Sequence, residues 1–344
     1  MTASITVGES GELPLPWLAR PLAEALAQQR GHALMLHGPA GIGTLHFGLA
    51  LAQAWLCEGG ESGSAQRRTG PCGRCGSCRL VQSHLHPDLY VLLPETLRQQ
   101  LEWPLAEDKI DDEGKKKPSR QIRIGEVRAA IDWVMKTTSR GRAKVLLMHP
   151  AETLNAQAAN ALLKTLEEPP AGTRVLLSVA DPAHLLPTVR SRCQRLPLPA
   201  PTPEEAERWL AGQGVADPGV LLSAASGRPL DAQALASAGI DAAAWTALPR
   251  AVARGQAGTF AGWPVPRAVD ALQKLCHDAL ALAAGGRSRY FPHDSVPAGG
   301  RLAELVNWQQ ELYRVARHDE HPWHEPLLLD ALVARGCSAF TLHS

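Results

Sequence analysis

Apolar runs and amphipathic helical patterns alternate over the first part of this chain. Four apolar runs predict buried strands, at residues 33–37, 89–93, 144–148 and 174–180. Apolar positions at helical spacing predict helices before and between them, at residues 14–30, 45–57, 124–138, 155–168 and 185–192. Strands that alternate with helices indicate a parallel sheet covered by helices on both faces, which is an α/β fold.

The rest of the chain is helical by pattern. No strand pattern follows residue 180, and the proline-rich stretch 196–201 is typical of a linker. Thr202 begins a helix with a capping-box pattern, and Pro203 occupies the first helical position. At 344 residues the chain is long enough for two or three domains. We predict three, which are an α/β domain at 1–197, a small helical domain at 198–241 and a helical domain at 242–344.

Composition places the chain among soluble globular proteins, with 45% apolar and 20% charged residues. A formal net charge of +1 gives no overall attraction to nucleic acid or anionic lipid. No apolar run approaches the roughly 18 residues of a membrane helix, and the N-terminus has no signal-peptide pattern. Four of the seven cysteines cluster and three are isolated, which is not a disulfide framework. We therefore expect a cytoplasmic protein without membrane contact.

A glycine-rich turn lies between the first strand and the helix after it. Residues 38–45 match the phosphate-binding template G-x-x-x-x-G-K-[ST] at Gly38 and Gly43, with Gly41 between them. Thr44 and Leu45 stand where a lysine should reach the phosphates and a hydroxyl should hold Mg²⁺. Such a loop could accept a nucleotide weakly, but it should not hydrolyse one.

A second, independent loss follows the strand at 144–148. P-loop ATPases carry an acidic pair there, which holds Mg²⁺ and polarises the attacking water. His149 and Pro150 occupy these positions and can do neither. We therefore expect that ATP is neither bound nor hydrolysed productively.

The clustered cysteines have metal-ligand spacing. Cys72, Cys75 and Cys78 form a C-x₂-C-x₂-C knuckle, and Cys57, at the end of the preceding helix, can supply a fourth thiolate. Four thiolates suit one tetrahedral Zn²⁺ in a closed, structural site. Unconnected free thiols and an iron–sulfur cluster are the alternatives. The compact spacing, with no redox motif nearby, favours zinc.

Residues 97–120 mix acidic side chains with three consecutive lysines and show little apolar periodicity. This composition predicts a solvated, mobile insertion, and a basic finger that touches DNA is the alternative.

Two short motifs carry a resemblance to a known family. Residues 159–170 read Ala-Asn-Ala-Leu-Leu-Lys-Thr-Leu-Glu-Glu-Pro-Pro, and Ser191, Arg192 and Cys193 form an S-R-C triplet. With the cysteine knuckle, they resemble the delta-prime family of bacterial DNA polymerase III clamp-loader subunits, within the AAA+ superfamily. The motifs cover about residues 14–240. The resemblance implies an AAA+ nucleotide-binding-like domain with a zinc module at 57–78, then a helical lid and a helical collar that joins subunits.

The resemblance also implies a role. The motor subunits of this superfamily, gamma and tau, keep the loop lysine and hydroxyl, the acidic pair and a sensor arginine. Here Leu230 aligns with the sensor position, although Arg228 is close to it. The losses imply an ATPase-dead stator in a hetero-oligomeric ring with gamma/tau and delta subunits. Such a stator helps load the sliding clamp onto primer-template DNA in chromosomal replication, so the nucleotidyltransferase activity belongs to the whole polymerase III holoenzyme.

Within the family, the arginine of the S-R-C motif reaches the ATP of a neighbouring motor subunit, which implies this catalytic role in trans for Arg192. Two other functions remain open. One is an active AAA+ ATPase of the gamma/tau type, and the other is a zinc-dependent nucleic-acid binder, which 5% aromatic residues and the near-zero charge disfavour. An apolar stripe along 302–315 is either core of the last domain or a surface that binds a partner.

Overall fold

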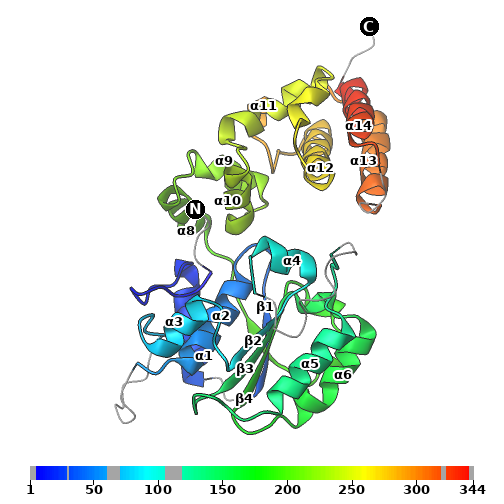
Figure 1. The fold of residues 1–344 in the computed structure, drawn as a ribbon. Helices are drawn as coiled ribbons and strands as arrows, with labels where there is room; N and C mark the ends of the chain where they lie inside the picture. Colours follow the sequence, from blue (N-terminus) through cyan, green and yellow to red (C-terminus); the bar gives the residue numbers. More distant parts are fainter. Residues whose placement is uncertain (1–4, 29–30, 60–69, 105–117, 319–322, 341–344) are drawn as a thin grey trace. The chain divides into compact units, whose positions relative to one another are not determined.

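The chain divides into two compact units, Met1–Pro201 and Thr202–Ser344. A computed structural model describes residues 5–28, 31–59, 70–104, 118–318 and 323–340. Within these ranges the first unit contains a β-sheet with helices around it, and the second is built from helices (Figure 1). None of the helices described is both long enough and apolar enough to span a lipid bilayer.

The sheet of the first unit has five parallel strands in the order β2-β3-β4-β1-β5. The strands are β1 (Ala33–His37), β2 (Leu89–Leu92), β3 (Lys144–Met148), β4 (Thr173–Val179) and β5 (Gln194–Pro197). Because neighbouring strands run parallel, their carboxyl ends lie along one edge of the sheet. The segments that follow β1, β3 and β4 therefore meet at this edge.

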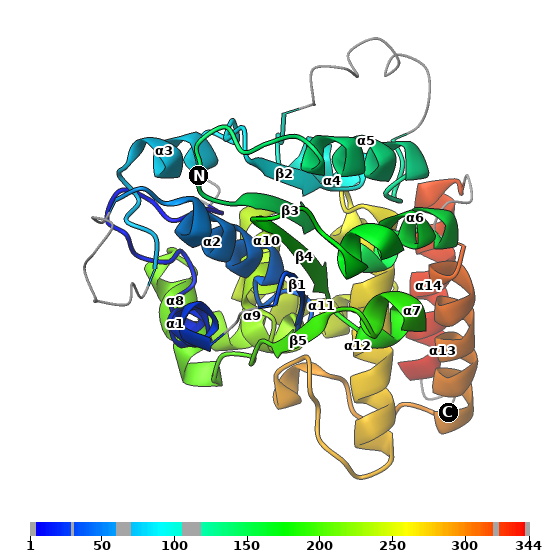
Figure 2. The same cartoon turned by 90° about the horizontal axis from the view of Figure 1, so that it is seen from below.

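The sheet separates two layers of helices (Figures 1 and 2). On one side lies α2 (Thr44–Leu56), with α1 (Ala19–Gln28) beside it; on the other lie α5 (Ile124–Val134) and α6 (Ala156–Glu167). Gly48 lets α2 approach the sheet closely, since a Cβ there would lie 2.8 Å from Leu147 Cδ1. Met35 and Leu146 join the core on the α5–α6 side. The α/β fold with a parallel sheet flanked by helices is thus confirmed.

The prediction that no strand follows residue 180 is wrong. β5 pairs with β1, with Leu34 opposite Gln194, and the N–H of Leu198 donates to the carbonyl of His37 at 2.7 Å. β5 is the last strand in the order, so Pro197 removes no hydrogen bond that a central strand would need. Its residues are mostly exposed. An edge strand without an apolar run gives no strand pattern, which is why the proline-rich composition indicated a linker.

The stretch 97–120, predicted to be mobile, is ordered at both ends. The helix α4 (Glu95–Gln100) extends into it, and Arg98 lies 3.9 Å from Glu126 with both side chains largely buried. At the other end, the N–H of Ser119 donates to the carboxylate of Glu95 at 2.7 Å. The residues that make these contacts are far apart in sequence, so no local sequence pattern predicts them. Residues 105–117, including the three lysines, lie outside the described residues.

The second unit begins as predicted, with Thr202 and Glu205 in a reciprocal capping box. Its helices are α8 (Pro203–Gly212), α9 (Pro218–Ala224), α10 (Pro229–Ser237), α11 (Ala242–Ala253), α12 (Val265–Ala283), α13 (Leu302–Ala316) and α14 (Glu325–Phe340). Trp245 and Trp308 are its largest fully buried side chains. The division of this unit at residues 241 and 242 stays a prediction.

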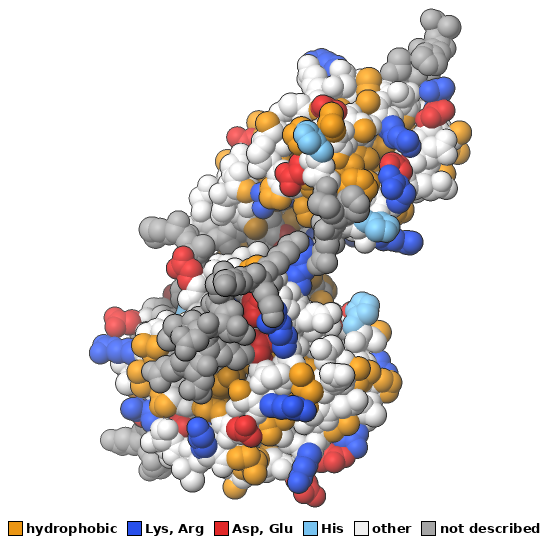
Figure 3. Space-filling model, turned by 45° about the vertical axis from the view of Figure 1, so that its right-hand side comes forward, with side chains coloured by type: hydrophobic (Ala, Val, Ile, Leu, Met, Phe, Trp, Pro, Cys, Tyr) orange, Lys and Arg blue, Asp and Glu red, His pale blue; other side chains and the backbone are white. Residues whose placement is uncertain are grey.

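The apolar stripe of α13 is mostly core. Three of its predicted members are buried, namely Leu305, Leu312 and Val315. Leu302 instead is 58% exposed and shares its side of the helix with two other exposed apolar residues, Val306 and Tyr313. Apolar side chains also gather among charged ones on the face of the second unit drawn in Figure 3. We call Leu302, Val306 and Tyr313 the outer α13 stripe.

Candidate functional site

The four predicted cysteines lie together at the end of α2 and the start of α3 (Gly76–Gln82). Their Sγ atoms all lie within 4.8 Å of one another. Individual separations are 3.4 Å for Cys57 and Cys72, 3.7 Å for Cys57 and Cys75, and 3.9 Å for Cys72 and Cys78. Ligands at about 2.3 Å from a tetrahedral Zn²⁺ would be about 3.8 Å apart. The cluster therefore has the dimensions of a site for a single metal ion.

Backbone N–H groups donate to two of these sulfurs. Cys75 Sγ accepts from the N–H of Cys78 and from that of Glu58, each at 3.4 Å, and Cys57 Sγ accepts from the N–H of Cys72 at 3.3 Å. Burial opposes ionisation, yet these donors lower the pKa of Cys75 to about 6. Burial raises the pKa of Cys78. A divalent cation at the centre would let all four ionise, so the donor set fits Zn²⁺.

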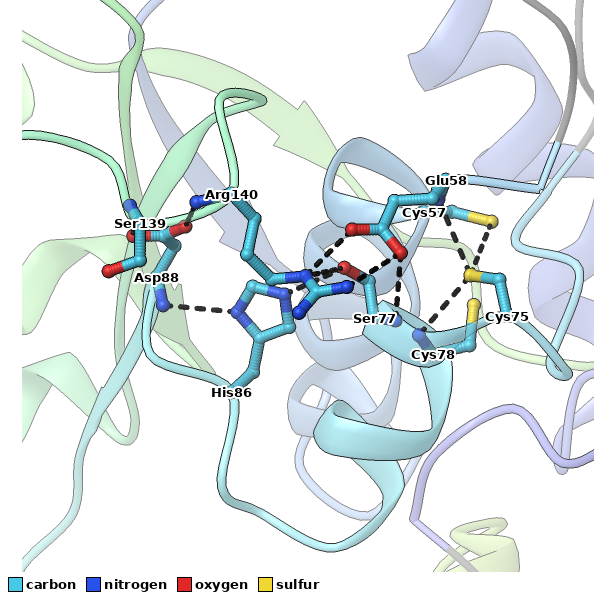
Figure 4. Close-up of polar contacts among 9 residues, drawn as sticks. All are labelled: Cys57, Glu58, Cys75, Ser77, Cys78, His86, Asp88, Ser139 and Arg140. Carbon is cyan, nitrogen blue, oxygen red and sulfur yellow. Dashed lines mark hydrogen bonds and ion pairs between the residues drawn. The ribbon is translucent and has the colours of Figure 1, made fainter.

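A polar shell surrounds the cluster on the side of the sheet (Figure 4). Glu58 and Ser77, the neighbours of Cys57 and Cys78, bind the side chain of Arg140. The hydrogen bonds from Arg140 lower the pKa of Glu58 to about 2, against the effect of its burial. No local sequence pattern predicts this shell, because Arg140 is 82 residues from Glu58.

The predicted glycine-rich turn lies between β1 and α2. Gly41 and Gly43 have φ of +75° and +98°, which other residues rarely adopt. A Cβ on Gly38 would lie 2.6 Å from the carbonyl oxygen of Leu198. The indole of Trp17 donates to the carbonyl of Ile42 at 2.9 Å. The three predicted glycines thus form one turn that leads into α2, with its N–H groups at a helix N-terminus.

The residues at the lysine and hydroxyl positions of the template, Thr44 and Leu45, carry no charge for phosphate or Mg²⁺. Thr44 and Leu45 are buried, at 8% and 6% exposure. His149, at the end of β3, bonds the hydroxyl of Ser178 through Nδ1 at 2.8 Å. Burial lowers the pKa of His149 and of His46 on α2 to about 4, so both are neutral at pH 7. Two residues near His149, His46 and Ser178, were not predicted from the sequence to lie at this site.

Arg192 follows the short helix α7 (Pro187–Arg190) and lies about one third exposed. Its Nε donates to Glu167 Oε1 at 2.6 Å, and its Nη1 donates to the carbonyl of Thr188 at 2.9 Å. Glu167 ends α6, so this ion pair joins the two motifs that carry the family resemblance. Its hydrogen bonds within the described residues go to α6 and α7 and not to the loop 38–45.

A comparison with protein families identifies the family of the chain. The family model described as "DNA polymerase III, delta subunit" matches residues 17–202, which is more than half of the 344 residues. The chain belongs to this family. The matched span includes the glycine loop, the four cysteines and the S-R-C triplet.

Curated relatives include DNA polymerase III subunits delta' and tau. DNA polymerase III subunit delta' of Pseudomonas aeruginosa is 36% identical over 220 residues, which cover 62% of this chain and 58% of that protein. The delta' subunit of Yersinia pestis is 38% identical over 201 residues, 57% of this chain and 51% of that one. Subunit tau of Salmonella typhimurium is 31% identical over 179 residues, which cover 52% of this chain and 23% of that protein. The chain spans about half the length of the delta' relatives it matches, and its resemblance to delta' subunits is confirmed.

We expect the cysteine cluster to bind one zinc ion. Elemental analysis of the purified chain should find about one zinc per chain, because four thiolates in a closed site bind the metal firmly. Cys75→Ser should lower the zinc affinity at least about tenfold, since a lost ligand should cost no less than a lost outer partner. Cys276→Ser removes a buried thiol outside the cluster and should keep the metal. A fully folded native chain without metal would contradict the prediction.

Proposed function

We propose that this chain is a non-catalytic subunit of a cytoplasmic DNA polymerase III clamp loader. It acts in a ring with gamma/tau and delta subunits and helps place the sliding clamp on primed DNA. The names of its delta' relatives support this role. Zn²⁺ in the cysteine cluster is a structural part of the subunit, because all four ligand positions are taken by thiolates and none is left for a substrate.

The chemistry of the phosphate loop carries the non-catalytic assignment. ATP hydrolysis requires cations that bind the β- and γ-phosphates and a group that orients water. The positions for these groups hold buried Thr44 and Leu45 and the neutral His149. Removal of a single group that stabilises transition-state charge typically costs about 10²–10³ in rate. Losses in two separate elements therefore leave no route to useful turnover.

Phosphate release from the isolated chain tests this assignment against a motor subunit, the alternative that the match to tau keeps open. We expect turnover no faster than the background of ATP without protein, because the charges that drive phosphoryl transfer are missing. A gamma or tau motor assayed in parallel is the positive control. Release well above background that rises in proportion to the concentration of the purified chain would establish the alternative.

In this proposal Arg192 assists ATP hydrolysis in a neighbouring subunit. Guanidinium stays charged and offers a planar fork of donors to phosphate oxygens. In the free chain this fork binds the carboxylate of Glu167, which holds it in place at the end of α7. On assembly the fork faces the ATP of a neighbouring motor subunit, where it stabilises charge on the transferred phosphoryl group. A chain that cannot hydrolyse ATP thereby promotes hydrolysis by its partner.

Arg192→Ala tests that contribution in the assembled complex. We expect normal folding, zinc content and assembly, but a loss of at least about tenfold in DNA- and clamp-stimulated ATP hydrolysis, as arginine fingers contribute 10³–10⁵ in well-studied GTPases. Arg192→Lys should recover little, because an ammonium cannot reproduce the fork. Arg190→Ala, which removes a cation two residues away, is the matched control. An Arg192→Ala complex with the unmodified rate would remove Arg192 from the mechanism.

The outer α13 stripe suits assembly, because it places apolar side chains on the surface of the predicted collar. The double variant Val306→Asp, Tyr313→Asp should weaken association with gamma/tau and delta subunits at least about tenfold, as charges enter an apolar contact. Asn307→Asp adds a negative charge on another side of α13 and should assemble normally. Gel filtration of mixed subunits measures both. Normal assembly of the first variant would exclude the stripe from the interface.

A further inference from the structure

A buried carboxylate holds the turn that leads into β3. Asp88 is fully buried, and its two oxygens accept from the N–H groups of Ser139 at 2.7 Å and Arg140 at 2.9 Å. Its own N–H donates to His86 Nδ1 at 3.0 Å. An imidazole that accepts at Nδ1 carries its hydrogen on Nε2, so His86 donates to Ser77 Oγ at 3.1 Å. The turn is therefore linked to α3, which carries Cys78.

The side chain of Arg140 reaches the same helix by a second route (Figure 4). Its Nε and Nη2 donate to the two oxygens of Glu58 at 2.7 and 3.0 Å, and its Nε also donates to Ser77 Oγ at 3.0 Å. Glu58 accepts in addition from the N–H of Ser77 at 3.3 Å, and its own N–H donates to Cys75 Sγ at 3.4 Å. Glu58 thus binds both the sulfur cluster and the guanidinium.

Gly76 leaves room for this arrangement. A Cβ at Gly76 would lie 3.2 Å from Arg140 Nη2 and 3.5 Å from Glu58 Oε2. The guanidinium therefore packs directly over the first residue of α3, between the cysteine knuckle and the sheet. A bidentate arginine–carboxylate pair has a fixed geometry, and this makes it a stiff link.

The ion pair between Arg140 and Glu58 also affects the electrostatics of the metal site. Zn²⁺ with four thiolates carries a net charge of −2, and the carboxylate of Glu58 adds another negative charge beside it. Arg140 offsets this repulsion through its contact with Glu58. Partners outside the ligand shell commonly orient metal ligands and set the affinity of the site.

We propose that Arg140 couples metal binding by the four-cysteine cluster to the order of the turn at residues 137–141. The inference rests on metal binding by the cluster. Arg140 binds Glu58 with its side chain and Asp88 with its main-chain N–H, so the same residue contacts both partners. By linkage, metal protects the turn, and an ordered turn raises metal affinity by the same factor.

Zinc affinity of the full chain tests one half of this coupling. Titration with Zn²⁺ against a competing chelator should give a Kd at least about tenfold higher for Arg140→Ala than for the unmodified chain. Arg140→Ala combined with Glu58→Gln should recover part of the loss, because the uncompensated carboxylate is gone. Arg79→Ala removes an exposed arginine of α3 that pairs with Glu9 and should leave the Kd unchanged.

Hydrogen exchange tests the other half. Removal of zinc from the unmodified chain should speed exchange of the amides of Ser139 and Arg140 at least about tenfold, while amides inside β4 keep their protection. In Arg140→Ala these turn amides should exchange fast even with zinc, and chelation should change them little. Arg140→Lys keeps the charge and loses the fork, so it should give intermediate values and serves if Arg140→Ala does not fold.

The outcomes separate this inference from the metal site itself. A native chain that contains no zinc would remove both. The coupling would be overturned, with the metal site intact, by three results together. The chain would contain one zinc, Arg140→Ala would leave the Kd unchanged, and chelation would not change the exchange rates of the turn amides. A higher Kd without rescue by Glu58→Gln, and without any response of the turn amides, would also overturn it, since Arg140 would then act on the metal alone.

Discussion

The packing of α2 against the centre of the sheet is the constraint on which both candidate sites depend. The helix begins at the glycine-rich turn, after Gly43, and ends at Cys57, the first cysteine of the cluster. Gly48 lets it lie against Leu147 and Leu36. Because one rigid helix carries both features, the phosphate loop and the metal cluster are held in a fixed relation. A close-packed interior leaves little freedom to move one without the other.

The two ends of α2 differ in their electrostatics. At the N-terminal end Thr44 and Leu45 are buried and uncharged, and burial keeps the imidazoles of His46 and His149 uncharged. At the C-terminal end, charged groups of both signs surround the thiols, including Glu58 and Arg140.

Much of the fold and of the candidate sites follows from local pattern. Strands β1 and β3 have the predicted bounds, and the four cysteines that the spacing brought together do lie within 4.8 Å of one another. Such features can be predicted because each depends on the pattern of a few residues that lie close together in the sequence. β5 and α4 were not readable in this way, since an exposed edge strand lacks an apolar run and α4 is held by contacts with distant residues.

The α/β class, the family, the uncharged residues at Thr44 and Leu45 and the grouping of the four cysteines could all be predicted from the chain's residues alone. Each depends on which residue types stand at short, fixed spacings. Packing set the other relations: Glu167 binds Arg192, Leu302 is exposed, and Arg140 contacts both Glu58 and Asp88. These relations join residues brought together by the packing of separate helices and strands, and a single sequence contains no local pattern for them.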